Sequence, residues 1–261
     1  MINISQLNEI QILAFGLIML RMTSFVTSSA IFSSASISVL VKILFSVVLT
    51  FLVFKSVATN TVIARISEHQ DQLVLLCARE LMLGLVLGFF TRIFFFALSM
   101  AGEIVSVSTG LGQAQLFNPM IGSMGNAMEQ FYTTVGTLLF LALNGHHMML
   151  QGLVQSFSVS EIAQLQFNSN SFAEVVLKAQ EFFEMGIKIS APILISMIMV
   201  QVGVALLSRA VPQINVMVTS ASVTSLLGFT IIFISLPLLA LQMSGLLDLT
   251  TVEFFKFMKT L

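Results

Sequence analysis

The chain of 261 residues is 57% hydrophobic and only 9% charged, with a mean hydropathy of +1.00, which indicates an integral membrane protein. Its 11 basic and 12 acidic residues give a net charge of −1 and form no basic cluster, which excludes nucleic acid as a partner. Cys77 is the only cysteine, so an intrachain disulfide and a thiolate metal cage are both excluded. No basic stretch precedes the first apolar run, so we expect Met1 to remain in the mature chain.

Six apolar segments approach the roughly 20 residues that a helix needs to cross a bilayer. They are, in chain order, residues 10–32, 39–57, 73–106, 129–143, 189–207 and a stretch within 210–247. We therefore predict an all-α, membrane-embedded fold of about six long apolar helices, arranged as helical hairpins in one domain over residues 1–261. Ahead of the fifth segment, Ser171 and Glu174 have the spacing of a capping box and predict a separate amphipathic surface helix over residues 171–188.

Three arginines lie inside these apolar segments: Arg21, Arg79 and Arg92. An arginine at the centre of a span costs about 2.5 to 3.5 kcal/mol on insertion scales, so we expect the three side chains to face protein or water. The chain also has no Trp and a single Tyr, although membrane helices usually carry aromatic belts at both interfaces. One interpretation is that other proteins, more than lipid, surround the helices. The other is that the abundant Phe and Met replace the missing aromatic residues.

Glu80, Gly84, Gly88 and Arg92 follow one another at intervals of four, which places them on one stripe of a helix. Two glycines at this spacing allow a second helix to approach closely, and the charges at either end can bond across to it. We interpret the stripe as a helix-packing seam that holds an assembly together. The alternative is a chance occurrence of small residues in a long helix.

The segment GLGQAQLFNPMIGSMGN, residues 110–126, is polar and uncharged within an otherwise apolar chain. Irregular backbone at membrane depth must be buried in protein or line a water-filled cavity, because lipid cannot satisfy its amides. Gly110 and Gly112 permit bends, and Pro119 ends any helix before it. We predict a flexible plug or gate loop, and the alternative is a connecting loop exposed to water. The side chains bulky enough to obstruct a passage are Leu116, Phe117 and Met120.

Motifs for catalysis, metal or cofactor binding are missing. The adjacent His146 and His147 point about 100° apart on a helix and make a poor chelate, so a helix end at Asn144 and Gly145 is the better interpretation. GLGQAQ lacks the preceding strand and the further residues of a nucleotide-binding loop. The chain also has no Gly-x-Ser-x-Gly elbow and no paired aspartates. We predict a protein that is not an enzyme and that binds no cofactor or metal.

Three stretches together carry a resemblance: AGEIVSVSTGLGQAQLFNP at residues 101–119, LNGHH at 143–147 and SRAVPQINVMV at 208–218. They resemble the signature regions of the R component of the flagellar type III export gate, the FliR family, whose injectisome counterpart is the T component. Glu80 with Gly84 and Gly88 resembles a further pattern of that family, and order and spacing agree over residues 73–228. Two stretches depart from it. SFVTSSAIFSSASISVL lacks prolines that the family often has, and TSASVTSLLG lacks a Pro-Leu-Lys type sequence.

The resemblance implies a subunit of a closed helical channel through which unfolded export substrates leave the cytoplasm. Its implied partners are the P and Q gate components (FliP and FliQ), FlhB-type and FlhA-type components, the unfolded substrates and lipid. It also implies a P-like portion over residues 1–188, including the plug loop, fused to a Q-like C-terminal hairpin over residues 189–261.

The resemblance also implies two groups of site residues besides the seam. The implied channel plug consists of Gly110, Leu111, Gly112, Gln113, Ala114, Gln115, Leu116, Phe117, Asn118, Pro119, Met120 and Gly122. The implied partner interface consists of Asn144, Gly145, His147, Arg209, Pro212, Gln213 and Asn215.

We therefore expect a structural and gating subunit of the flagellar export channel, located in the bacterial inner membrane within the flagellar basal body. Two alternatives remain open at this point: the T component of an injectisome gate, and a self-contained secondary transporter of small solutes. The transporter would use midplane charges such as Arg21, Arg79 and Arg92 to bind an anion, and it would transport as a single chain.

Overall fold

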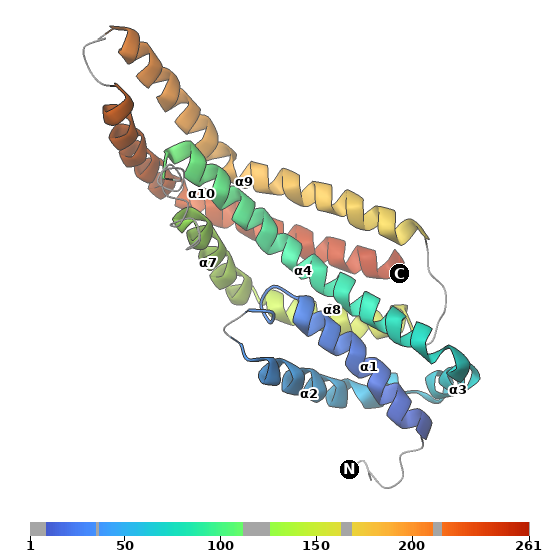
Figure 1. The fold of residues 1–261 in the computed structure, drawn as a ribbon. Coiled ribbons are helices and arrows are strands. Elements are labelled where there is room, and N and C mark those ends of the chain that lie inside the picture. Colours follow the sequence, from blue (N-terminus) through green and yellow to red (C-terminus); the bar gives the residue numbers. More distant parts are fainter. Residues whose placement is uncertain (1–8, 35–36, 112–125, 163–168, 211–215, 261) are drawn as a thin grey trace. The chain divides into compact units, whose positions relative to one another are not determined.

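The computed structural model describes residues 9–34, 37–111, 126–162, 169–210 and 216–260, and this part of the chain contains helices and their connections without a strand (Figure 1). Its elements are α1 (Glu9–Ser28), α2 (Val39–Val57), α3 (Asn60–Glu68), the 3-10 helix η2 (Gln70–Gln72), α4 (Leu73–Thr109), α7 (Ala127–Ala142), α8 (Gly145–Val159), α9 (Ser169–Ala210) and α10 (Val216–Thr260). The predicted all-α, membrane-embedded class is confirmed.

Within the described residues, five helices are long and apolar enough to cross a membrane. They are α1, α2 and α4 over their whole lengths, α9 over Phe183–Ala210 and α10 over Ser222–Lys256. The fourth apolar segment of the sequence forms α7, which has only 16 residues. At 1.5 Å per residue α7 covers about 24 Å, which is less than the roughly 30 Å of hydrocarbon.

Helix α9 continues through the point where the sequence predicts a boundary. The prediction of a separate helix that ends at residue 188 is wrong, because α9 runs without interruption from Ser169 to Ala210. It does so despite Pro192, which has no N–H to donate to the carbonyl of Lys188 one turn earlier. The side chain of Gln242 on α10 donates to that carbonyl instead, over 3.3 Å. A tertiary contact therefore compensates for the hydrogen bond that the proline removes.

Two compact units divide the chain, and each joins segments that are distant in the sequence. The first unit contains Met1–Ile93, His146–Leu177 and Thr250–Leu261, and the second contains Phe94–Gly145 and Lys178–Leu249. Helix α4 contributes residues to both. The division into a P-like portion over residues 1–188 and a Q-like hairpin over 189–261 stays a prediction.

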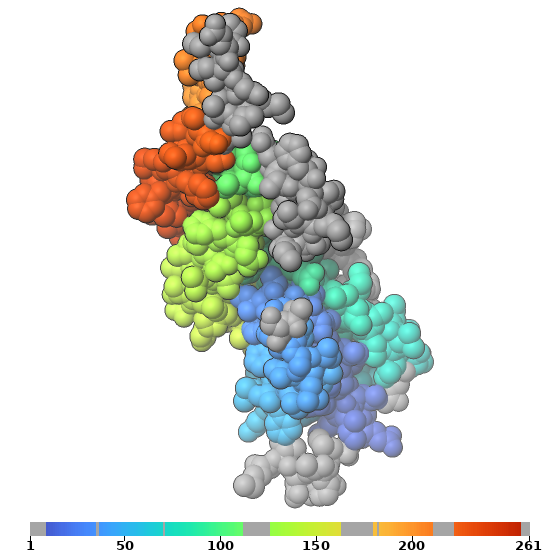
Figure 2. Space-filling model, turned by 60° about the vertical axis from the view of Figure 1, so that its left-hand side comes forward, coloured from blue at the N-terminus to red at the C-terminus, as the bar shows by residue number. Residues whose placement is uncertain are grey.

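Helix α1 lies at the centre of the first unit, where it contacts α2, α3 and α4. Its side chains Ile18, Met22 and Phe25 are fully buried. Helix α2 lies on the outside, and Figure 2 shows its side chains (light blue) on the face of this unit turned to the viewer. Leu40 and Leu52 of α2 are 67% and 73% exposed. A helix with such an uncovered apolar face is typical of contact with lipid or with partner helices.

Helices of the second unit approach the end of α4 at glycines. A Cβ atom at Gly136 of α7 would lie 2.1 Å from Cδ1 of Leu98, and one at Gly228 of α10 would lie 2.8 Å from Cβ of Thr109. Leu98 and Thr109 both belong to α4. Because glycine has no side chain at these contacts, α7 and α10 pack closely against the last three turns of α4.

Candidate functional site

The stripe of Gly84 and Gly88 on α4 packs against α1 of the same chain (Figure 1). A Cβ atom at Gly84 would lie 2.4 Å from the carbonyl oxygen of Arg21 and 1.8 Å from Oγ of Ser24. A Cβ atom at Gly88 would lie 2.9 Å from the carbonyl oxygen of Phe25. The two helix backbones therefore touch along two successive turns. The close approach predicted for the seam occurs within the chain, and the effect of the seam on an assembly stays a prediction.

A buried ion pair closes one end of the seam. Nε of Arg21 on α1 lies 2.6 Å from Oε2 of Glu80 on α4, and the two side chains are 0% and 1% exposed. The guanidinium of Arg21 also donates to Oγ of Ser156 and to the carbonyl oxygen of Ser160, and it lies 4.2 Å from the centre of the Phe157 ring. Hydrogen bonds and a cation–π contact thus satisfy this charge inside the protein, as expected for an arginine within an apolar segment.

A second buried arginine binds at the same place. Arg79, 3% exposed, donates to Oγ of Ser160 over 2.6 Å and to the carbonyl oxygen of Glu161 over 3.1 Å, and it lies 3.6 Å from the Glu80 carboxylate. Two guanidiniums and one carboxylate leave a positive excess. It is compensated by carbonyl oxygens just beyond the end of α8, where the helix dipole is negative. Arg21 and Arg79, whose side chains were expected to face protein, therefore attach the end of α8 to α1 and α4.

The last residue of the stripe, Arg92, is exposed and donates to Oγ of Ser33, over 3.0 Å. Ser33 follows α1, so both charged residues of the stripe contact the α1 side of the seam. The sequence singled out the arginines and the stripe but not Ser156 and Ser160, which accept from Arg21 and Arg79. Their spacing of four is the only sequence signal for these two serines, and it is common in helices.

The predicted plug segment begins where α4 ends. Gly110 has φ 80°, in the left-handed region that favours glycine, and its N–H donates to the carbonyl oxygen of Val107. Leu111 is half-buried. The other predicted plug residues, 112–120 and 122, lie outside the described residues, and their role as a plug stays a prediction.

The predicted interface residues fall into two places along the chain. Asn144 has φ 57° between α7 and α8, so the helix end predicted here is confirmed. Gly145 is buried, and a Cβ atom there would lie 2.7 Å from the Phe140 ring. The side chains of Asn144 and His147 are exposed, as is that of Arg209 in the last turn of α9. Residues 212, 213 and 215, which are Pro212, Gln213 and Asn215, lie outside the described part of the chain.

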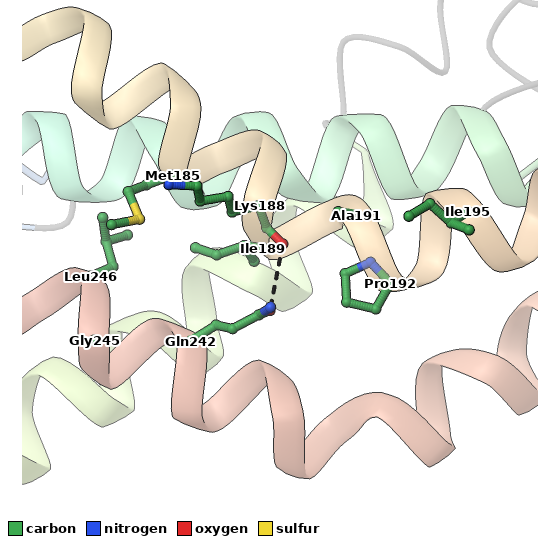
Figure 3. A pocket seen from close by; sticks show the side chains of 9 residues that line it. All are labelled: Met185, Lys188, Ile189, Ala191, Pro192, Ile195, Gln242, Gly245 and Leu246. Atoms are coloured by element: carbon green, nitrogen blue, oxygen red, sulfur yellow. Dashed lines mark hydrogen bonds between the residues drawn. The ribbon is translucent and has the colours of Figure 1, made fainter.

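A pocket of about 550 Å³ lies between α9 and α10 of the second unit (Figure 3). Its lining runs from Met185 to Ile195 on α9 and from Gln242 to Leu246 on α10, and it is almost entirely apolar. The Lys188 ammonium binds Glu184, and Nε2 of Gln242 donates to the carbonyl of Lys188, so the buried Oε1 of Gln242 is the polar side-chain atom in the lining that has no hydrogen-bond partner among the described residues. The pocket therefore lacks the convergent polar groups that would orient a small solute.

Comparison with known proteins places these features in a family. The chain matches the family model described as "Bacterial export proteins, family 1" over residues 12–250, which include the seam, the predicted plug segment and most of both units. It is 30% identical over 227 residues to the flagellar biosynthetic protein FliR of Aquifex aeolicus (strain VF5), and the match covers 86% of each chain. It is 25% identical to FliR of Bacillus subtilis (strain 168), over 91% of each chain.

A secretion protein matches over a shorter stretch. The chain is 33% identical over 172 residues to the Yop proteins translocation protein T of Yersinia pestis, which covers 62% of this chain and 63% of that protein. The resemblance to the FliR family, first supported by three short motifs, is confirmed over nearly the whole chain. The chain belongs to the bacterial export proteins, family 1.

Proposed function

We propose that this chain is the structural and gating subunit of a flagellar type III protein export channel. The observation that carries the proposal is the match to the family model over residues 12–250. The relatives named flagellar biosynthetic protein FliR agree with it, because this chain aligns with most of their length. The channel passes unfolded flagellar proteins across the bacterial inner membrane within the flagellar basal body. The five apolar helices of the described chain suit that location.

The subunit acts together with other export components. The P and Q gate components, FlhB-type and FlhA-type components are the partners we propose. The uncovered apolar face of α2 and the exposed apolar side chains of α9 and α10 support a chain that is surrounded by further helices or lipid. The proposed role is not enzymatic, so the energy for export comes from other components.

The segment that begins at Gly110 is proposed as the plug of the channel, with Leu116, Phe117 and Met120 as the obstructing side chains. Its support is the resemblance of residues 101–119 to a family signature and the left-handed conformation of Gly110, directly after the end of α4. The polar, uncharged composition of this segment suits a water-filled lumen, because backbone amides outside a helix at membrane depth need water or protein partners.

Deletion of Gln113–Asn118 tests the plug. We expect the variant gate, assembled with its partners, to leak ions about tenfold or more above the intact gate, because removal of an obstruction opens a water-filled passage. The measurement is ion conductance of the purified assembly in liposomes.

A control with matched composition exists in the same chain. Residues 163–168, AQLQFN, contain the same six residues as QAQLFN at 113–118, in a different order. Deletion of 163–168 is expected to leave conductance at the intact level. Equal conductance of the two deletion variants would contradict the plug.

Two alternatives are weaker. The injectisome T component matches over 62% of the chain, whereas the flagellar relatives match over 86% and 91%, which favours the flagellar system. A transporter of small anions would need free guanidinium groups. Arg21 and Arg79 instead donate to side chains and carbonyls at the end of α8, so few of their N–H groups remain to bind an anion.

A further inference from the structure

Two cationic side chains converge on one serine in the first unit. Ser33 follows α1, and its carbonyl oxygen accepts a hydrogen bond from Nζ of Lys42 on α2, over 3.0 Å. Its Oγ accepts a second hydrogen bond from the guanidinium of Arg92 on α4, also over 3.0 Å. Among the described residues, no ion pair involves Lys42 or Arg92. Serine is neutral, so the three residues form a basic site with two uncompensated positive charges.

The position of Lys42 on its helix adds to the positive potential of the basic site. Lys42 lies in the first turn of α2, which begins after the N-cap Ser38. The helix dipole is positive at this end and favours anions, so it disfavours a lysine there. The side chain of Arg92 is exposed and that of Lys42 is half-buried. An anion from outside the chain can therefore reach both cations and the beginning of α2.

Helix lengths place the basic site at one edge of the hydrocarbon. Helix α1 has 20 residues and α2 has 19, so each covers about 28 to 30 Å. Arg92 lies nineteen residues after Leu73, where α4 begins, which is again about 28 Å. The segment after α1 lies beside it, because the N–H of Ala30 donates to Oγ1 of Thr91. About one hydrocarbon thickness therefore separates the basic site from the other end of each of these helical segments.

Uncovered apolar side chains adjoin the basic site on two helices. On α2, Leu40 and Leu44 are exposed within one turn of Lys42. On α4, Leu85 and Phe89 are exposed and lie seven and three residues before Arg92, which places them on the same face of the helix. A cationic site at the edge of apolar faces is complementary to a molecule with an anionic head and an apolar body.

We propose that Lys42, Arg92 and Ser33 bind the phosphate of a membrane phospholipid, whose acyl chains lie against the exposed apolar faces of α2 and α4. The guanidinium of Arg92 presents a planar fork of N–H donors to the phosphate oxygens, and Lys42 adds a point charge. Lipid phosphates border the hydrocarbon, where the helix lengths place the basic site. The inference does not depend on the proposed export role, because it uses only contacts within the first unit.

The test is native mass spectrometry of the purified full chain, with the subunits that accompany it, during titration with phosphatidylglycerol. We expect one phosphatidylglycerol to bind more tightly than the others. Arg92→Gln is expected to weaken its binding about tenfold, because a charge-assisted hydrogen bond to the phosphate is lost. Lys42→Gln is expected to weaken it about fivefold, as for one cation near an anionic lipid. Lys55→Gln is the matched control, since it removes the same charge from the opposite end of α2, and it is expected to leave this affinity unchanged.

The outcomes separate phospholipid from the other anions that could bind. Equal affinities in the Arg92→Gln and Lys55→Gln variants overturn the inference. Displacement of the lipid by an excess of inorganic phosphate would show a site for free phosphate, whereas a retained lipid supports the contribution of the acyl chains. If Arg92→Gln keeps the lipid but loses an accompanying subunit, the guanidinium pairs with a carboxylate of that subunit and the lipid assignment is wrong. Should Arg92→Gln fail to accumulate, an unchanged affinity in Lys42→Gln overturns the inference.

Discussion

Replacing Gly84 by leucine is expected to separate α1 from α4 and to prevent a stable fold of the first unit. A Cβ atom at this position would lie 2.4 Å from the backbone carbonyl oxygen of Arg21, and backbone cannot rotate away as a side chain can. Overpacking of a well-packed core costs about 1 to 3 kcal/mol, and a contact with backbone belongs at or above the upper end of that range. The measurement is protease resistance and accumulation of the chain, followed by its yield in the purified complex.

Gly16→Leu is the matched control, because Gly16 also lies in the first unit, on α1, and a Cβ atom there would meet no heavy atom within 4 Å apart from its chain neighbours and the nearby backbone of its own helix. We expect this variant to resist protease like the original chain. The account of the seam would be contradicted if Gly84→Leu and Gly16→Leu resisted protease equally and entered the complex in equal amounts. If Gly84→Leu folded but did not assemble, the seam would act between subunits, as first inferred from the sequence.

Replacing Glu80 by alanine is expected to destabilise the first unit by about 3 to 5 kcal/mol, because it leaves the guanidinium of Arg21 buried without its carboxylate. Arg79, 3.6 Å from the same carboxylate, would lose its counter-charge in the same change. The two arginines would then repel each other at the end of α8. The measurement is the denaturant or temperature midpoint of the purified complex.

Glu184→Ala removes the acid of a second ion pair and serves as the control. Lys188 and Glu184 lie 2.7 Å apart, but they are 58% and 62% exposed, so solvent screens their interaction. Exposed pairs of this kind contribute less than about 1 kcal/mol. Equal midpoints for the Glu80→Ala and Glu184→Ala variants would contradict a structural role for the buried pair.

Apolar run length predicts most of the fold, because a helix in a membrane must satisfy its own backbone. Segments 10–32, 39–57 and 73–106 correspond closely to α1, α2 and α4. The spacing of Gly84 and Gly88 likewise predicts a close helix contact, since glycines four apart share one face. Composition could not show that α9 passes through Pro192, because the carbonyl of Lys188 is satisfied by Gln242, fifty-four residues later.

The partners of the buried arginines are also beyond a sequence pattern. Exposing the charged side chains of Arg21 and Arg79 to lipid would cost too much free energy. This argument predicts that they are buried, but it does not predict which residues surround them. Their acceptors lie at the end of α8, 135 residues from Arg21 in the case of Ser156. The bonds of Lys42 and Arg92 to Ser33 are missed for the same reason. Such contacts depend on how the helices pack, which no local pattern specifies.

The central claim is tested most directly by purifying the complex that contains a tagged copy of this chain from its own membrane. The measurement is the native mass and the composition of that complex. In mild detergent, the export-gate account predicts a large assembly that contains this chain with several small helical partners. Recovery of a lone monomer or homodimer that moves a small solute in liposomes would contradict it. The chain would then act as a transporter, and residues 110–126 would line a substrate site.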